Sequence, residues 1–377
     1  MAKDWNALRD EFPITRNYNF LNHAAAAPIS RRAADAARAY LAHAEANAYL
    51  RGRFFKHIER VRGQAAALIN ANADEIAFVK NTSEGLSFVA NGLTWQSRDN
   101  VVTTNAEFPA NIYPWQALRP LGVEVRMVLE EDGRIPLERM IEAIDPRTRV
   151  VSISSVQFAS GFRTDLATLG EYCQSKGVFL CVDAIQSLGA FPIDVAGMKI
   201  DFLSADGHKW LCAPEGAGVF YVRKEIQGYL RPTTIGWFSM KEPFVFDKYQ
   251  FEFADTARRY ESGSHNLPGV YALGGAMELA LEIGIDQIAE RLLALTDRMT
   301  TGLREKGYRV VSSRAPAEAS GIVAFISDLH DHERVREHLE AEHRIVIAVR
   351  NGRLRASPCF YNTEGEIDQL IDALPKH

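Results

Sequence analysis

Short apolar runs alternate with amphipathic stretches over the first 260 residues, and this alternation predicts strands separated by helices. The apolar runs are rich in Val, Ile and Phe, whereas the segments between them repeat apolar residues every three to four positions. Strands spaced by helices are typical of βαβ units and of a mainly parallel, buried sheet. The expected strands cover residues 76–80, 101–104, 123–129, 150–156, 178–183, 202–204 and 218–223.

The pattern changes near residues 255–270. Two long helical stretches are followed by short strand-like runs at residues 308–311, 321–326, 345–350 and 354–357. Short strands interleaved with helices favour a smaller α+β domain. We therefore predict an α/β fold with a large domain at 21–260, built on a mainly parallel sheet flanked by helices, and a smaller α+β C-terminal domain at 261–377. Residues 1–20 are expected to pack near the small domain.

Composition excludes several classes of function. With 47% hydrophobic and 24% charged residues and a net charge of −5, the chain has ample core and no basic patch, so nucleic acid is not an expected partner. The start of the chain lacks a signal-peptide core, and no apolar run could cross a bilayer. We expect a cytoplasmic protein without a membrane partner. The four cysteines, which form no CxxC pair, predict neither a metal site nor a disulfide framework.

Two strand ends carry the most informative side chains. One apolar run ends at Asp183, and another leads into Ser204-Ala-Asp-Gly-His-Lys-Trp210, which contains Lys209. Either residue alone is more often a turn former or a solvated strand end. Pyridoxal phosphate, however, needs both a lysine amine for its aldehyde and a carboxylate that keeps its ring nitrogen protonated. Because ligands collect at the carboxyl ends of parallel strands, the two residues are expected to share one site.

The chain resembles the class V aminotransferase-type enzymes of the fold type I pyridoxal-phosphate superfamily, within the group of cysteine desulfurases, selenocysteine lyases and isopenicillin N epimerases. The resemblance runs from Tyr18-Asn-Phe-Leu-Asn-His23 to Tyr361-Asn-Thr-Glu-Gly-Glu-Ile-Asp368, and Gly207-His-Lys209 with Asp183 and Gln186 is its most specific part. It implies that Lys209 binds pyridoxal 5'-phosphate and moves the Cα proton of an amino-acid substrate. It also implies that Asp183 pairs with the ring nitrogen and that Gln186 bonds the phenolic oxygen.

The resemblance extends to the ring and the phosphate of the cofactor. Phe108 takes the place of the side chain that stacks on the ring. Thr82 and Ser83 open a helix whose positive end suits a phosphate. His208 resembles a further phosphate ligand.

Two positions near the phosphate need separate comment. Asp206 stands where relatives carry a serine, so Ser204 is expected to compensate. Gly263 and Ser264 resemble an element that reaches the phosphate of a neighbouring subunit, which implies a homodimer.

The substrate side is expected to centre on Arg355, which matches the arginine that binds the substrate carboxylate; its planar fork suits two parallel hydrogen bonds. Asn22 and His23 resemble the segment that lines the substrate entrance. Gln157 lies near the position of an asparagine that contacts the cofactor oxygen.

Two departures from the desulfurase pattern narrow the expected reaction. Phe108 and Pro109 occupy the places of two histidines, and phenylalanine cannot transfer a proton. Only residues 351–354 separate Arg350 from Arg355, where desulfurases carry a mobile loop with a nucleophilic cysteine. Cys359 is expected to be a buried thiol within a strand. The predicted reaction is therefore β-elimination by a C–S lyase.

Other functions remain open. Epimerisation of the isopenicillin N epimerase type needs protons on both faces of Cα, and transamination is a third possibility. A nicotinamide-dependent dehydrogenase is disfavoured because no G-x-G-x-x-G follows the first strand. A catalytically silent binding member is disfavoured because Lys209, Asp183 and Arg355 are all present.

Overall fold

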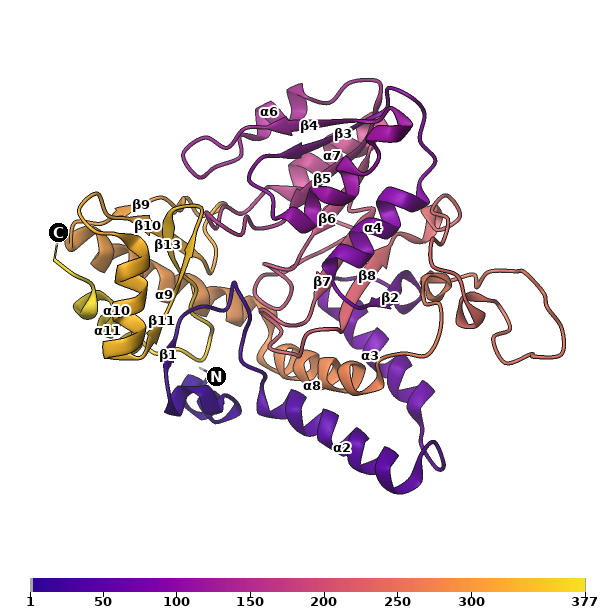
Figure 1. The fold of residues 1–377 in the computed structure, drawn as a ribbon, viewed down its shortest axis with the longest axis horizontal. Coiled ribbons are helices and arrows are strands. Elements are labelled where there is room, and N and C mark those ends of the chain that lie inside the picture. The colour runs from indigo at the N-terminus through magenta and orange to yellow at the C-terminus, as the bar shows by residue number, and fades with distance from the viewer. Residues whose placement is uncertain (1–2, 377) are drawn as a thin grey trace.

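A seven-stranded sheet dominates the computed structural model, which describes residues 3–376 (Figure 1). The strand order is β2-β8-β7-β6-β5-β3-β4. Strands β7, β6, β5, β3 and β4 run parallel, whereas β8 is antiparallel to both of its neighbours. The strands are β2 (Ile76–Val79), β3 (Asn100–Thr104), β4 (Glu124–Val128), β5 (Thr148–Ser154), β6 (Phe179–Asp183), β7 (Phe202–Asp206) and β8 (Gly218–Val222). The predicted α/β fold with a mainly parallel sheet is confirmed.

Both faces of this sheet are buried because successive side chains of a strand point to opposite sides. Val101 and Cys181 pack in one hydrophobic cluster, and their neighbours Val102 and Val182 pack in another. Helix α4 (Thr82–Gly92) contributes to the first cluster. Three helices contribute to the second: α3 (Phe54–Leu68), α7 (Leu166–Lys176) and α8 (Leu267–Ile283).

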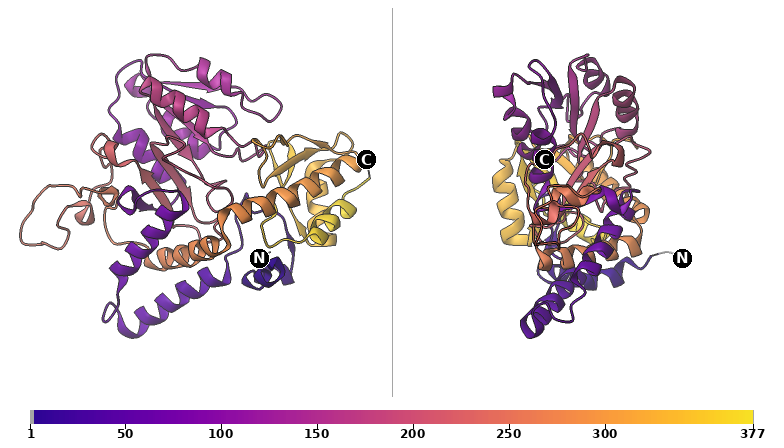
Figure 2. Two further views of the ribbon diagram at one scale, coloured as in Figure 1. Left: turned by 180° about the vertical axis from the view of Figure 1, so that it is seen from behind. Right: turned by 90° about the vertical axis from the view of Figure 1, so that its right-hand side faces the viewer.

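The chain also forms a four-stranded antiparallel sheet in the order β12-β13-β10-β9. Its strands are β9 (Arg309–Val310), β10 (Val323–Ile326), β12 (Ala348–Arg350) and β13 (Arg353–Ala356). Figure 2 shows α9 (Ile285–Glu305) extending from α8 to this sheet, beside which lie α10 (His332–His343) and α11 (Glu364–Ala373). A separate parallel pair joins β1 (Asn19–Phe20) to β11 (Ile345–Val346). The domain boundaries stay a prediction.

Two expectations about the C-terminal strands are wrong. The run at 345–350 was expected as one strand, but Ile347 separates β11 from β12, which belong to different sheets. Cys359 lies in a turn after β13 and not in a strand. Pro358 precedes it and has no N–H group to donate to a neighbouring strand, which accounts for the end of pairing.

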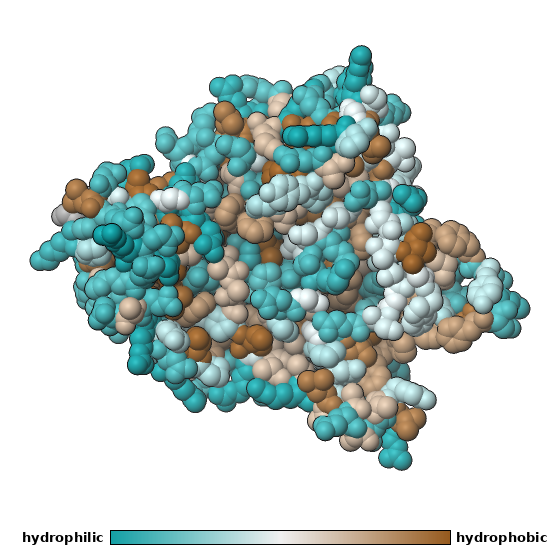
Figure 3. Space-filling view, in the orientation of Figure 1, coloured by the Kyte–Doolittle hydropathy of each residue, from teal (hydrophilic) through white to brown (hydrophobic). Residues whose placement is uncertain are grey.

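The remaining α-helices are α1 (Trp5–Leu8), α2 (Arg31–Asn47), α5 (Tyr113–Gln116) and α6 (Leu137–Glu142). Residues 235–253 project from the body as an arm at the right of Figure 1. Apolar side chains are exposed on this arm, as Figure 3 shows in the same orientation, and they include Trp237, Phe244, Phe246 and Phe251. Within residues 3–376, no helix is long and apolar enough to span a membrane.

Candidate functional site

A cavity of about 240 Å³ lies at the carboxyl edge of the large sheet. Strands β6 and β7 run parallel, so the residues that follow them, and those that follow β2, meet at this edge. The cavity brings together many of the predicted site residues, namely Lys209, Asp183, Phe108, Thr82, Ser83, His208 and Arg355.

Lys209 and Asp183 are both buried in the wall of this cavity. Burial lowers the pKa of the Lys209 amine to about 8, although the Asp183 charge opposes this change. Burial also raises the pKa of Asp183, and the nearby Glu107 carboxylate raises it further. A lysine with a depressed pKa has more unprotonated amine near neutral pH, which is the form that attacks a carbonyl.

The Lys209 amine lies 5.7 Å from the centre of the Phe108 ring. Phe108 is 46% exposed, and its ring packs edge to face against Phe158 at 5.3 Å. An aromatic ring that is half exposed beside a cavity has an accessible face on which a planar ligand can stack. Phe158, which also lines the cavity, was not found from the sequence.

Glu107 is a buried carboxylate next to Phe108 that sequence reasoning did not single out, and burial raises its pKa. Its oxygens accept hydrogen bonds from the backbone N–H of Ser154 at 2.7 Å and from the side-chain amides of Gln157 at 2.8 Å and Asn111 at 3.0 Å. These bonds tie the turn after β3 to the end of β5 and fix the backbone that carries Phe108.

The first turn of α4 forms another wall. Thr82 and Ser83 line the cavity at the positive end of this helix, where an anion is stabilised. The Ser204 hydroxyl donates to the Thr82 carbonyl at 3.0 Å and does not line the cavity. This packing needs Gly85, because a Cβ there would lie 2.3 Å from the Ser204 hydroxyl.

Asp206 is turned toward its own loop. Its carboxylate accepts a hydrogen bond from the Gly207 amide at 2.7 Å and lies 2.9 Å from Nδ1 of His208. The Asp206 amide donates to the Thr82 hydroxyl at 3.1 Å. The carboxylate is thus held by a backbone N–H of its own loop and faces the His208 ring.

Arg355 is fully buried on β13, and its guanidinium reaches the cavity. It donates to the Phe158 carbonyl at 2.6 Å and to Oδ1 of Asn22 at 3.4 Å. Its Nε has no hydrogen-bond partner among residues 3–376. Burial, followed by the charge of Arg350, lowers the pKa of Arg355 to about 9. A desolvated guanidinium with an unused N–H donor is suited to bind an anionic group.

Arg350, which also lines the cavity, was missed as a site residue. The signal that could have found it is the two-residue period of a strand pair. Arg350 pairs with Arg353 across the hairpin, and Arg353 and Arg355 alternate along β13, so all three point to one face. Arg353 forms an ion pair with Glu130 at 2.5 Å, which leaves Arg350 and Arg355 at the cavity.

Several predicted residues do not line the cavity. The Gln186 amide donates to the Ala24 carbonyl at 3.0 Å and accepts from Nε1 of Trp210 at 2.9 Å. Gln157 is buried against Glu107, as described above, and His23 is buried beneath the cavity wall formed by Ala24.

Gly263 and Ser264 lie in a second hollow, of about 240 Å³, that also contains Lys80. A buried network fixes this segment. Glu261 accepts from Arg62 at 2.6 Å and from the Phe78 amide at 2.8 Å, and His265 bonds its second oxygen at 2.9 Å.

Comparison with known proteins gives consistent matches over nearly the whole chain. Residues 19–370 match the family described as "Aminotransferase class-V". A probable cysteine desulfurase of Methanothermobacter thermautotrophicus is 30% identical over 97% of this chain and 96% of its own. A cysteine desulfurase of Klebsiella pneumoniae is 32% identical over 85% of this chain and 82% of its own. The apo structure of a cysteine desulfurase from Thermococcus onnurineus has a TM-score of 0.90 at 26% identity, covering 99% of this chain and 97% of that one.

Proposed function

The chain belongs to the class-V aminotransferase family and is a pyridoxal-phosphate enzyme of the cysteine desulfurase type, and we propose that it catalyses β-elimination from an amino acid with sulfur at its β-carbon. Two relatives, one named as a probable cysteine desulfurase and one as a cysteine desulfurase, point to such a substrate. The products would be pyruvate, ammonia and sulfide or a substituted thiol.

One structural observation favours elimination over desulfuration. Strands β12 and β13 are joined by a turn of two residues, Asn351 and Gly352, with φ of 49° and 71°. Two positive φ values and the Asn-Gly sequence are typical of a type I′ hairpin turn. Such a turn has no room for a mobile loop, and all four cysteines are buried away from the cavity lining. A thiol that accepts sulfur from the substrate is therefore not expected.

The cavity provides the groups that pyridoxal phosphate requires. Lys209 would hold the aldehyde carbon through its amine, Asp183 would keep the ring nitrogen protonated, and Phe108 would cover the ring. Thr82, Ser83 and His208 would hold the phosphate. When bound, the cofactor supplies a ring that accepts the negative charge formed at Cα of the substrate.

The protein groups then divide the work of the reaction. Arg355, with Arg350 beside it, would bind the substrate carboxylate and so orient Cα toward the Lys209 amine. Released by the substrate, this amine would take the Cα proton, a role that its lowered pKa favours. Phe108 covers the site without offering a proton, which disfavours epimerisation.

The test is a product assay with cysteine, cystine and S-substituted cysteines. Elimination yields pyruvate and ammonia in equal amounts, and the sulfur leaves as sulfide from cysteine, as a thiol from an S-substituted cysteine and as cysteine persulfide from cystine. Alanine formed with enzyme-bound sulfur would instead establish desulfuration. Loss of optical activity without products would establish epimerisation, and a 2-oxo acid formed only with an amino-group acceptor would establish transamination.

A homodimer with shared sites is part of this proposal. Ser264 lies outside the cavity of its own chain, so any contact with a phosphate would be made with that of a second copy. The exposed aromatic arm lies against this segment, because Gly236 packs on Ser262, where a Cβ would come within 2.0 Å of the Ser262 carbonyl oxygen. An apolar surface of this kind is typical of an obligate interface, which usually buries more than about 2,000 Å².

Sedimentation of the purified enzyme at its assay concentration tests this assembly. The expected species is a dimer, and Ser264→Ala should release cofactor more readily than Ser262→Ala. A fully active monomer would contradict the shared site.

A further inference from the structure

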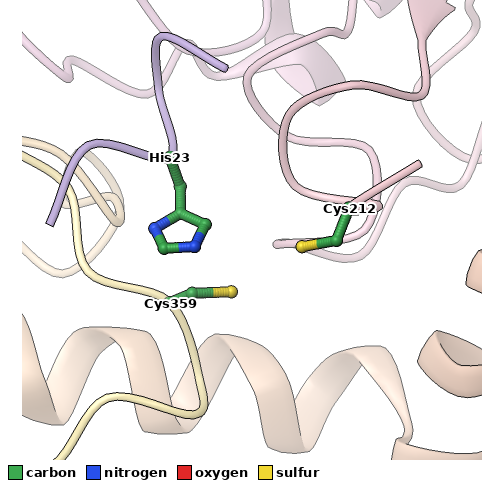
Figure 4. A group of neighbouring side chains, drawn as sticks. All are labelled: His23, Cys212 and Cys359. Carbon is green, nitrogen blue, oxygen red and sulfur yellow. The ribbon is translucent and has the colours of Figure 1, made fainter. Parts of the chain in front are cut away.

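A cluster of soft ligand atoms lies beneath the candidate active site. The side-chain ligand atoms of His23, Cys212 and Cys359 all lie within 4.8 Å of one another. Figure 4 shows the three side chains converging from three separate segments of the chain. They are 0%, 2% and 1% exposed, respectively, so the cluster is closed to solvent.

The imidazole of His23 is oriented by the backbone. Nδ1 lies 3.1 Å from the Ser357 carbonyl, which can only accept a hydrogen bond, so Nδ1 carries the proton and Nε2 keeps its lone pair. A metal-bound histidine characteristically donates its other N–H to a carbonyl in this way. Nε2, which then has no proton, accepts a hydrogen bond from the Tyr361 hydroxyl at 2.8 Å; a metal at Nε2 would replace this bond, and the Tyr361 oxygen lies beside the cluster as a fourth ligand atom.

The backbone at Cys212 is unusual. Its φ of 56° lies in the left-handed region, which residues other than glycine rarely adopt. Hydrogen bonds hold it there: the Cys212 amide donates to the Lys209 carbonyl at 3.0 Å, and the Cys212 carbonyl accepts from Ser30 at 3.0 Å. Cys359 is held by its own turn, in which its amide donates to the Asn362 side chain at 2.8 Å. A backbone held in an unfavourable conformation is a feature that clusters at functional sites, so the Cys212 backbone supports a function for this residue.

We propose that His23, Cys212 and Cys359 bind one Zn²⁺ ion, with the Tyr361 oxygen as the fourth ligand. Zinc takes four ligands from sulfur, nitrogen and oxygen donors, and thiolates favour it over harder cations. Binding converts two thiols to thiolates and releases two protons to solvent. Two thiolates, one neutral imidazole, the Tyr361 phenol with its proton retained and one Zn²⁺ have no net charge, which suits a site without solvent. A monovalent ion would leave a buried negative charge.

The ion would have a structural role that goes beyond the proposed reaction. Cys212 follows Lys209 by three residues, Cys359 follows Arg355 by four, and His23 adjoins Ala24 at the cavity wall. A single ion would thus fix the segments that carry the lysine and the arginine. Because the cluster is closed, zinc would enter during folding and not by addition to the folded enzyme.

Metal content after refolding tests the site. The enzyme is unfolded with chelator, refolded with pyridoxal phosphate and either zinc or magnesium, and washed with a mild chelator. We expect about one zinc per chain after refolding with zinc and a higher Tm than after refolding with magnesium. Wild-type enzyme that retains less than about a tenth of an equivalent of zinc would overturn the proposal.

X-ray absorption at the zinc edge examines the ligands in the wild-type enzyme. Two sulfur neighbours at about 2.3 Å and nitrogen or oxygen neighbours at about 2.0–2.1 Å are expected, and a shell of nitrogen and oxygen alone would overturn the proposal. Cys212→Ala and Cys359→Ala should each lose the zinc, whereas Cys173→Ala, which removes another buried thiol, should keep it. Zinc retained in both cluster variants would also overturn it.

Discussion

The cavity has a lysine end, with Lys209 and Asp183, and an arginine end, with Arg350 and Arg355, and the two ends differ in their electrostatics. At the lysine end, Lys209 and Asp183 carry opposite charges, and burial disfavours the charged form of each. At the arginine end, Arg350 and Arg355 carry like charges; burial, followed by the charge of Arg350, lowers the pKa of Arg355 to about 9, which leaves it charged at neutral pH. The lysine end can exchange a proton near neutral pH, whereas the arginine end keeps its positive charge and can bind an anion.

The scaffolds of the two ends differ as well. The lysine end lies at the edge of the large parallel sheet, after β6 and β7. The arginine end lies on the β12–β13 hairpin, and Asn22 near the start of the chain supports it at 3.4 Å. In the proposed reaction, proton transfer would take place at the edge of the large sheet and substrate binding on a smaller, separate element. Changes at the two ends should therefore have different kinetic signatures.

The largest effect is expected at the lysine end. Lys209→Ala should lower kcat by roughly a thousandfold, because it removes both the attachment of the cofactor and the group that moves the Cα proton. Borohydride reduction of the wild-type enzyme should attach the cofactor to the Lys209 peptide, as read by mass spectrometry. Lys176→Ala, at an exposed lysine, is the control. A label on another lysine with Lys209 unmodified would end this assignment.

Substitutions at the arginine end should lower activity mainly by raising KM. Arg355→Ala leaves the substrate carboxylate without its partner, which costs roughly 2–5 kcal/mol in kcat/KM. Arg355→Lys should recover part of this loss, since it keeps the charge without the fork. Arg350→Ala should have a smaller effect. If the whole loss in kcat/KM of Arg355→Ala came from kcat, with KM unchanged, the assignment of substrate binding to the arginine end would be contradicted.

The protonation of Lys209 predicts a pH dependence of cofactor attachment. Only the free amine reacts, so attachment to the apoenzyme should accelerate as pH rises through about 8 and level off above it. At pH 7 this corresponds to roughly a tenfold slower attachment. Nα-acetyl-lysine, whose midpoint lies near about 10.4, is the reference compound.

Asp183→Asn sharpens this test. The Asp183 charge raises the Lys209 pKa, so its removal should move the midpoint to lower pH. A midpoint near that of the free amino acid in the wild type would contradict the effect of burial.

The smallest effect is expected for the cysteines. Cys359→Ala and Cys212→Ala, separately and together, should each change turnover per folded, cofactor-loaded enzyme by less than about tenfold, although stability can fall. A loss of about a thousandfold, equivalent to about 4 kcal/mol of transition-state stabilisation, would instead require a catalytic thiol. Thermal unfolding and cofactor content are measured first, so that misfolding is not taken for lost chemistry.

The residues that could be predicted from the sequence are those whose position follows from local rules. Lys209 and Asp183 lie at the ends of apolar strands, and Thr82 and Ser83 open a helix. Their meeting at the carboxyl edge of the sheet could therefore be predicted. Gln186 and His23 were expected at the cavity, but their side chains bond other partners, since the direction of a side chain depends on packing.

The buried cluster was beyond sequence reasoning for another reason. Metal-ligand motifs are recognised by short spacings, and the cysteines were judged on that basis. His23, Cys212 and Cys359 lie more than a hundred residues apart along the chain. Only the tertiary packing of three distant segments brings them together. The split of residues 345–350 between two sheets likewise depends on β1, a partner from the far end of the sequence.

The Asn351–Gly352 turn also bears on how this enzyme could acquire new chemistry. Both residues are exposed, and a Cβ at Gly352 would meet no atom within 4 Å. Loop length can change at such a position at little cost, since each doubling adds only about 0.6 kcal/mol. Arg350, on one side of the turn, already lines the cavity. Inserted residues would therefore emerge beside the substrate, so this hairpin is a natural place for evolution or design to add a reactive group without rebuilding the fold.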